Sequence, residues 1–313
     1  MSAAYAHECD IAVVGAGISG LTACAHAAEL GASVVCIEPN ILLGGLVTNV
    51  GVLGSYPAPT AVSGSGLAEA LRERCTMRGT SLLTSRVTAV APAADRFDVV
   101  TLDGTVSAKI VIVASGGRLR KLGVPGEAEL AGRGVSQCDW CDGGLFRDAD
   151  VVVVGGGDAA LQAALHLAEM CRSVSVIVRG QQLRARWHYL QAAADNDRIT
   201  FHWETLVERI IGTECVEAVV LRNCQDGRLH ELPARGIFIF IGTEPNSDFL
   251  PSQVKRDSGG FVETDCDGRT SVPGMYAIGG VRRGYRGLIV NAIGDGAAAA
   301  AAAVEALRED AIR

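Results

Sequence analysis

The sequence of 313 residues has few aromatic residues, no excess of positive charge and no long uninterrupted apolar run. Aromatic residues make up 5% of the chain and the net charge is -7, which argues against a nucleic acid as partner. No basic run or basic amphipathic helix indicates a membrane surface. The first ten residues are too short and too polar for a signal peptide, and no apolar run approaches a membrane span of about 20 residues. We therefore expect a cytoplasmic protein without a membrane partner.

The sequence also lacks the paired cysteines of a secreted disulfide framework. It has 10 cysteines, but only Cys138 and Cys141 are separated by two residues. Such a pair can close a disulfide ring, form half of a metal site, or be two surplus thiols. We expect most of the others to be small buried hydrophobic residues.

Hydrophobic residues make up 49% of the chain, enough for about two domains with cores of their own. The first domain opens with a strand, a glycine turn, a helix and a second strand that ends in an acid. These features are the strand 10–14, Gly15, Gly17 and Gly20, the helix 18–30, the strand 33–37 and Glu38. Glycines there let the backbone approach a pyrophosphate at the helix N-terminus, and Glu38 suits a free ribose 2′-hydroxyl.

A second unit of the same kind begins 140 residues later (155 minus 15). It has the strand 151–154, Gly155, Gly157 and Ala160, the helix 161–170 and the strand 174–178. Arg179 stands where the first unit has Glu38, and Arg184 follows. Guanidinium groups at this place suit a 2′-phosphate, so the pattern predicts FAD in the first unit and NADPH in the second. The alternative is that both are solvated surface arginines.

The position of Cys138 and Cys141 between the two units favours redox chemistry over a structural metal, and we predict no metal site. The predicted fold class is α/β, with two Rossmann-like dinucleotide-binding domains, the second inserted in the first. Residues 105–108 are expected to end a β-meander and 109–114 to form a separate core strand. The FAD-binding domain is predicted to span residues 1–118 and 245–313, and the NAD(P)H-binding domain residues 119–244.

These residues in this order resemble the low-molecular-weight thioredoxin reductases, over nearly the whole chain. The motifs that carry the resemblance are Gly15 to Gly20, Glu38, Gly44-Gly45, Ala114-Ser115-Gly116, residues 132–136, Cys138 to Gly143, Gly155 to Ala160, Gly242 with Pro245-Asn246, and Gly274 to Gly279. The Cys-x-x-Cys-Asp-Gly segment just before the second glycine turn is the most specific of them.

The resemblance implies a disulfide reductase that passes electrons from NADPH through FAD to the cysteine pair. Cys141 would face the flavin, Cys138 would attack the partner's disulfide, and Asp142 would manage protons. A homodimer is expected, with a thioredoxin-like protein or a small-molecule disulfide as partner. The implied FAD-binding residues are Gly15, Gly17, Gly20, Glu38, Pro39, Gly44, Gly45, Leu46, Val87, Ala114, Ser115, Gly116, Gly279, Arg286, Gly287 and Leu288. The implied NADPH-binding residues are Gly155, Gly157, Asp158, Ala159, Arg179 and Arg184.

The sequence departs from the family pattern at several cofactor positions. Gly180 replaces the middle arginine of the basic signature. Four polar flavin contacts are replaced by Leu46, Ser55, Gly280 and the segment Arg286-Gly287-Leu288, and Trp140 is bulkier than the usual residue between the cysteines. Two alternatives follow. One is a divergent enzyme not driven by NADPH, which is either a dithiol oxidase that uses oxygen or a ferredoxin-linked reductase. The other is a non-catalytic flavin-binding redox sensor.

Overall fold

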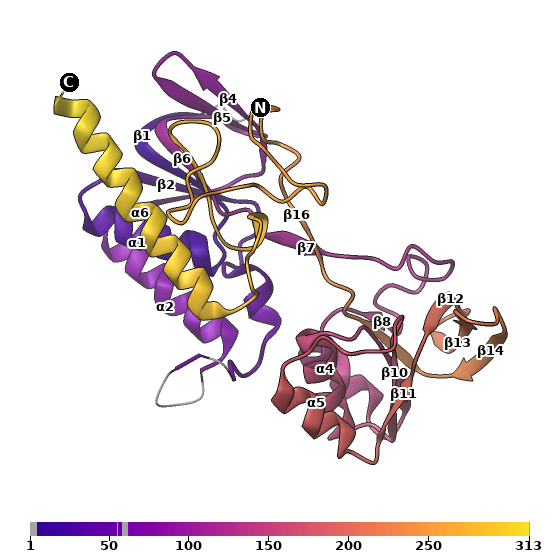
Figure 1. The fold of residues 1–313 in the computed structure, drawn as a ribbon. Coiled ribbons are helices and arrows are strands. Elements are labelled where there is room, and N and C mark those ends of the chain that lie inside the picture. Colours follow the sequence, from indigo (N-terminus) through magenta and orange to yellow (C-terminus); the bar gives the residue numbers. More distant parts are fainter. Residues whose placement is uncertain (1–4, 55, 58–61, 313) are drawn as a thin grey trace. The chain divides into compact units, whose positions relative to one another are not determined.

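The computed structural model describes residues 5–54, 56–57 and 62–312, so Ser55 lies outside the described residues (Figure 1). The chain forms two compact units. Unit 1 comprises Met1–Arg118 and Glu244–Arg313, and unit 2 comprises Leu119–Thr243. Glu244, which the sequence placed at the end of the second domain, therefore belongs to unit 1.

Unit 1 is built on a seven-stranded sheet with the order β3-β2-β1-β6-β5-β4, and β17 pairs with β6. Its strands are β1 (Tyr5–Val14), β2 (Val34–Glu38), β3 (Ser81–Thr84), β4 (Val87–Ala93), β5 (Arg96–Thr101), β6 (Gly104–Val113) and β17 (Met275–Ala277). The expected break before residue 109 is wrong, because β6 is one strand that pairs with β1 along most of its length. Its first half also pairs antiparallel with β5.

Three helices pack together on one face of this sheet: α1 (Ile18–Glu29), α2 (Gly64–Met77) and α6 (Ile289–Ile312) (Figure 1). Short 3-10 turns η1 (Gly45–Asn49) and η3 (Gly279–Val281) complete the unit. Within α6, Ile289–Glu309 is the one helical segment of the described chain that is long and apolar enough to cross a membrane. Its buried alanines pack in the same core cluster as α1, which is the environment of a core helix.

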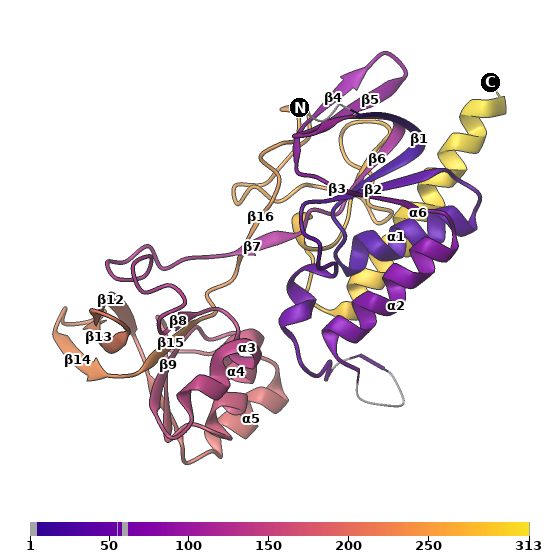
Figure 2. The same ribbon diagram turned by 180° about the vertical axis from the view of Figure 1, so that it is seen from behind.

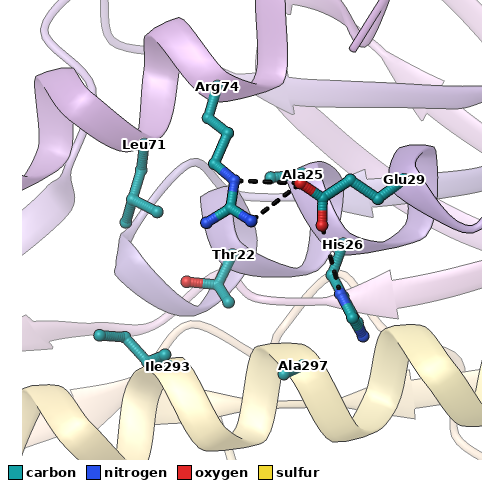
Figure 3. A pocket seen from close by; sticks show the side chains of 8 residues that line it. All are labelled: Thr22, Ala25, His26, Glu29, Leu71, Arg74, Ile293 and Ala297. Atoms are coloured by element: carbon teal, nitrogen blue, oxygen red, sulfur yellow. Dashed lines mark hydrogen bonds and ion pairs between the residues drawn. The ribbon is translucent and has the colours of Figure 1, made fainter.

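A small cavity of about 170 Å³ opens between α1, α2 and α6 (Figure 3). Its lining is mostly apolar, with Glu29 bound to Arg74 at 2.8 Å and close to His26 at its edge. None of the residues predicted for catalysis or cofactor binding lines it. The cavity therefore does not belong to the predicted nucleotide site.

Unit 2 has a parallel five-stranded sheet with the order β11-β10-β9-β15-β8 and an antiparallel meander, β12-β13-β14. The parallel strands are β8 (Val135–Ser136), β9 (Asp150–Val154), β10 (Ser173–Ile177), β11 (Ile199–His202) and β15 (Gly236–Ile239). The meander strands are β12 (Thr205–Gly212), β13 (Val216–Asn223) and β14 (Leu229–Pro233).

The helices of unit 2 are α3 (Asp139–Asp142), α4 (Asp158–Ala168) and α5 (Trp187–Ala194), and the turn η2 (Gly143–Phe146) follows α3 (Figure 2). The predicted strand–helix–strand of the second glycine turn corresponds to β9, α4 and β10. In the linking segments, β7 (Gly117–Leu119) pairs with β16 (Thr243–Pro245).

Candidate active site

A disulfide joins Cys138 and Cys141 across one helical turn, with their Cα atoms 5.3 Å apart. Cys138 is the N-cap of α3, and its sulfur accepts a hydrogen bond from the backbone N–H of Cys141 at 3.1 Å. Cys141 is exposed and Cys138 is half-buried. The structure thus has the two sulfurs bonded, on a short helix that follows the edge strand β8, which is the first of the uses that the spacing allowed.

Asp142 at the end of α3 is held by Ser136 in β8. The Ser136 hydroxyl donates a hydrogen bond to the Asp142 carboxylate at 2.7 Å. The hydroxyl oxygen of Ser136 also accepts a hydrogen bond from the Cys138 N–H at 3.0 Å. Ser136 is buried, so its hydroxyl links the carboxylate to the backbone of the redox turn. The hydrogen bond therefore ties the Asp142 carboxylate to the segment that holds the cysteines. Ser136 lies in the motif 132–136 of the family resemblance, which alone does not predict this role.

Asp139, between the cysteines, is buried and binds a residue that the sequence analysis missed. Its carboxylate accepts a hydrogen bond from Nδ1 of His166 in α4 at 2.8 Å. The side chains are 11% and 14% exposed, so losing one partner would leave a buried polar group at a cost of about 3 kcal/mol. The Trp140 ring stacks on His166 with centroids 4.0 Å apart. No local pattern in the sequence indicates this contact, because its partners are 27 positions apart in the chain.

The eight other cysteines are free thiols. Five of them are buried, in agreement with the expectation for most of this group: Cys9, Cys24, Cys36, Cys75 and Cys171. Burial raises the pKa of the Cys9 and Cys171 thiols to about 11, which leaves them protonated at neutral pH. Cys224 and Cys266 are exposed instead.

The first glycine turn, between β1 and α1, has a backbone that only glycine fits. Gly15 has φ +105°, and a Cβ there would lie 2.4 Å from the carbonyl oxygen of Ala114 at the end of β6. A Cβ on Gly20 would lie 2.0 Å from the Gly15 carbonyl oxygen. Gly17 is the N-cap of α1 and no side chain caps the helix. The first N–H groups of α1 are therefore available to an anionic ligand.

The predicted FAD-binding glycines from distant segments line this turn. Gly44 donates to the Ala16 carbonyl at 2.8 Å, and Gly17 and Gly44 form a bridge. The nearest atom to a Cβ on Gly17 would be 3.9 Å away, and a Cβ on Gly116 would meet nothing within 4 Å. This strip of bare backbone has room for a flat dinucleotide, so the residues present fit FAD.

Glu38, at the end of β2, already accepts hydrogen bonds within unit 1. One carboxylate oxygen accepts from the Ala16 N–H at 2.9 Å, and the other from the backbone and side chain of Asn40 at 3.0 and 2.8 Å. The acid therefore braces the glycine turn, and the oxygen that accepts from Ala16 keeps one free lone pair for a ribose hydroxyl.

The remaining predicted FAD residues lie at several places in unit 1. Ser115 exchanges hydrogen bonds with Asn246 at 2.7 and 2.9 Å, and the Gly279 N–H donates to Asp295 at 3.0 Å. Asp295 also binds Arg282 through both oxygens, at 2.7 and 2.8 Å. The sequence analysis missed this pair, although an acid within an apolar helix is a signal for it. The rest are Pro39 after β2, Gly45 and Leu46 in η1, Val87 opening β4, Ala114 after β6, and Arg286, Gly287 and Leu288 before α6.

The second glycine turn repeats the geometry in unit 2. Gly155 has φ +140°, and a Cβ there would lie 2.2 Å from the Phe240 carbonyl oxygen. Gly157 is the N-cap of α4, again with no capping side chain, and Ala159 lies in the helix's first turn. The Asp158 carboxylate accepts hydrogen bonds from the backbone N–H of Arg186 at 2.7 Å and from its guanidinium at 2.6 Å. The Asp158 side chain therefore holds the loop before α5 in place.

Arg179 and Arg184 are exposed beside this second turn. Neither forms an ion pair with another residue in the described part of the chain. Arg184 is tied to the turn through its backbone, because its N–H donates to the Gly156 carbonyl at 2.7 Å. Two uncompensated guanidinium groups next to an uncapped helix N-terminus fit a dinucleotide that carries an additional phosphate.

The family described as pyridine nucleotide-disulphide oxidoreductase matches residues 9–296. The chain belongs to this family. A family member, the thioredoxin reductase of Treponema pallidum, is 37% identical over 295 residues, which cover 94% of this chain and 95% of the relative. The thioredoxin reductase of Mycolicibacterium smegmatis is 38% identical and covers 93% of this chain and 94% of the relative.

Solved structures of family members agree with the fold. The thioredoxin reductase of Lactococcus lactis superposes with a TM-score of 0.92 at 33% identity and covers 96% of this chain and 99% of its own. A ferredoxin-flavin thioredoxin reductase from Clostridium acetobutylicum has a TM-score of 0.54 at 25% identity, with coverage of 97% and 100%. The predicted α/β class and the family resemblance are confirmed. The chain is an FAD-dependent disulfide oxidoreductase of the thioredoxin reductase type, and the alternatives are not favoured.

Proposed function

We propose that the enzyme transfers electrons from NADPH to the Cys138–Cys141 disulfide and from there to the disulfide of a thioredoxin-like protein. The observation that carries this proposal is the disulfide on α3, with Asp142 beside it, in the same unit as the second glycine turn. The names of the relatives, which are thioredoxin reductases, support the choice of acceptor.

FAD, when bound, would supply two-electron transfer between a nicotinamide and a disulfide. Gly15, Gly17 and Gly44 would bind it by leaving room at the α1 N-terminus, and Glu38 would orient the ribose. Gly155 and Gly157 would bind NADPH in the same way, with Arg179 and Arg184 on the 2′-phosphate. We assign these roles to units 1 and 2 respectively.

The dithiol chemistry then follows from the pair itself. The disulfide takes up two electrons and two protons and becomes a dithiol. The Cys138 thiolate attacks one sulfur of the acceptor disulfide, and the other acceptor sulfur leaves as a thiolate and takes a proton. The Cys141 thiolate next attacks Cys138, which re-forms the disulfide and releases the second acceptor thiol. Asp142 would exchange protons with the departing and attacking sulfurs.

We also propose that the enzyme is a cytoplasmic homodimer. The eight free thiols suit a reducing compartment. Sedimentation analysis of the flavin-containing protein tests the dimer, and a single monomeric species would contradict it.

Anaerobic titration tests the electron path. We expect NADPH to bleach the flavin absorbance of the wild-type enzyme and of Cys141→Ser, whereas only the wild type reduces the acceptor disulfide. Cys224→Ser, at an exposed free thiol, is the matched control and should retain full activity. Reduction of the acceptor by Cys141→Ser would overturn the cysteine assignment. Absence of bleaching with NADPH would overturn the electron source and leave ferredoxin to be tried.

A further inference from the structure

The side chains of Asp139 and Trp140, between the two cysteines, both contact His166, and the proposed electron transfer does not involve them. Asp139 is buried, its carboxylate binds His166 at 2.8 Å, and the Trp140 ring stacks on the same imidazole with an interplanar angle of 16°. α3 and α4 pack against each other at this point (Figure 2). One imidazole therefore contacts both residues of the two-residue spacer.

This arrangement fixes the orientation of the indole of Trp140, a residue that lies between the two redox cysteines in the chain. A carboxylate that is nearly excluded from water keeps its hydrogen-bond partner, so Asp139 holds the His166 ring in one orientation. The imidazole then supports one face of Trp140. The other parts of the indole stay accessible, since Trp140 is 44% exposed. A large aromatic side chain in the turn that carries the redox disulfide is thereby held partly exposed.

A second exposed apolar side chain lies in the turn that continues from α3. Leu145 in η2 is 79% exposed, although the neighbouring Gly143 packs close to Leu167 of α4. Exposed apolar side chains at a reaction site are typical of protein recognition, and tryptophan contributes most strongly at such contacts. A small disulfide needs only the sulfur, whereas a protein disulfide brings a surface that can cover the indole.

We propose that Trp140 is a specificity-determining residue that contacts the surface of a protein acceptor, and that Asp139 and His166 are positioning residues that hold it in place. The proposal rests on the proposed function, because it takes the acceptor to be a protein disulfide. It predicts that Trp140 lowers the half-saturating concentration of a protein acceptor and leaves a small aryl disulfide unaffected.

The test uses the flavin-containing enzyme after reduction with dithionite, so that it does not depend on NADPH. Reoxidation is followed by stopped flow at increasing concentrations of oxidised bacterial thioredoxin or of the disulfide of nitrobenzoic acid. For Trp140→Ala we expect the half-saturating concentration of thioredoxin to rise about tenfold, the usual scale of a buried tryptophan contact. The limiting rate and the reaction with the aryl disulfide should stay as in the wild type.

The supporting residues give a second, graded readout. His166→Ala removes the ring on which the Trp140 indole stacks, so the indole can change its orientation. Thioredoxin would then have to immobilise the indole when it binds, and this entropy cost should raise the half-saturating concentration of thioredoxin roughly threefold to tenfold. Asp139→Asn keeps an oxygen that accepts from the imidazole, so it should behave like the wild type. If His166→Ala does not fold because Asp139 is left unpaired, the double variant Asp139→Ala/His166→Ala removes that group and tests the same point. Trp187→Ala, at another exposed tryptophan of unit 2, is the control and should change nothing.

Two results would overturn the proposal. One is an equal effect of Trp140→Ala on both acceptors, which would indicate a structural role. The other is a half-saturating concentration of thioredoxin that stays at the wild-type value in His166→Ala or in the double variant. Failure of reduced wild-type enzyme to react with thioredoxin would overturn both the acceptor and the contact. Failure of NADPH alone to bleach the flavin would overturn only the electron source.

Discussion

The two glycine turns of this chain have the same backbone but differ in what stands next to them. In unit 1, Glu38 is already engaged with Ala16 and Asn40. In unit 2 the corresponding place has Arg179, with Arg184 nearby, and neither pairs with a described carboxylate. The first turn is thus braced by its own acid, whereas the second leaves its charges for a ligand. The difference agrees with the proposed assignment of FAD to unit 1 and of NADPH, which carries an additional phosphate, to unit 2.

The likeness between the units extends to an acid in each first strand, five positions before the first glycine of the turn (15 minus 10 and 155 minus 150). Asp10 before the first turn binds the Ser33 hydroxyl at 2.7 Å, and Asp150 before the second binds the Ser173 hydroxyl at 2.7 Å. Each carboxylate also binds a cation, Lys109 at 2.9 Å for Asp10 and Arg172 for Asp150. The repeat therefore preserves a polar clamp between the first two strands as well as the glycine turn.

The largest expected effect is at the glycines that close each turn. Gly15→Ala puts a Cβ 2.4 Å from the Ala114 oxygen at φ +105°, a strain of about 1–2 kcal/mol before the clash is counted. We expect this variant to be purified with little or no FAD and to unfold at a lower temperature. Gly155→Ala should instead keep its FAD and lose reduction by NADPH. The ratio of flavin to protein absorbance separates the two, and equal flavin content in both variants would contradict the assignment of cofactors to units.

Gly157→Ala is the matched control for folding. A Cβ there meets nothing within 4 Å, so the melting temperature should stay that of the wild type, while the half-saturating NADPH concentration rises because the helix N-terminus is partly covered.

The glycine turns could be predicted from the sequence because every part of the signal is local: a strand, three small residues, a helix and a terminal charge. The cysteine pair was recognisable for the same reason. The Asp139–His166 contact could not be predicted, since it joins residues of two helices whose packing the spacing does not encode. The helix α5 and the strands β11 and β14 were missed because they are short and mostly lack a strong apolar period.

A smaller effect is expected at the basic residues of the second unit. Arg179→Gln removes one charged hydrogen-bond donor, so the half-saturating NADPH concentration should rise about tenfold, while that of NADH is unchanged. Steady-state flavin reduction with both nucleotides measures this ratio. An equal rise for NADH would show that Arg179 supports the loop and does not contact a 2′-phosphate.

Gly180→Arg sharpens the same comparison in the opposite direction. The position is exposed, and a Cβ there meets nothing within 4 Å. A third guanidinium should lower the half-saturating NADPH concentration about threefold, which is the scale of a solvent-exposed charge contact. Gly180→Gln, of similar length without charge, is the control and should have little effect.

The smallest effect concerns the clamp at Asp10. Burial alone would raise the pKa of this carboxyl, but the hydrogen bonds from Ser33 and Lys109 outweigh it and lower the pKa from 3.8 to about 2. The stabilisation is therefore complete above about pH 4 and is lost as the pH falls toward 2. Asp10→Asn should make the melting temperature less dependent on pH between these two values. A pH profile as steep as that of the wild type would assign the acid sensitivity to other groups, such as Asp150, whose pKa is lowered by Arg172.

Unit 2 is one continuous stretch of chain, whereas unit 1 is assembled from two distant segments. On the ribosome, Leu119–Thr243 can fold as soon as it emerges, since the strands of its five-stranded sheet and of its meander all lie within it. The core of unit 1 has to wait for β17 and α6, which pack on β6 and α1 and are translated after unit 2. The chain of the unit that carries the redox disulfide is thus complete before that of the unit with the first glycine turn, so under the proposed assignment of FAD to unit 1 the flavin binds only after unit 2 has been synthesised.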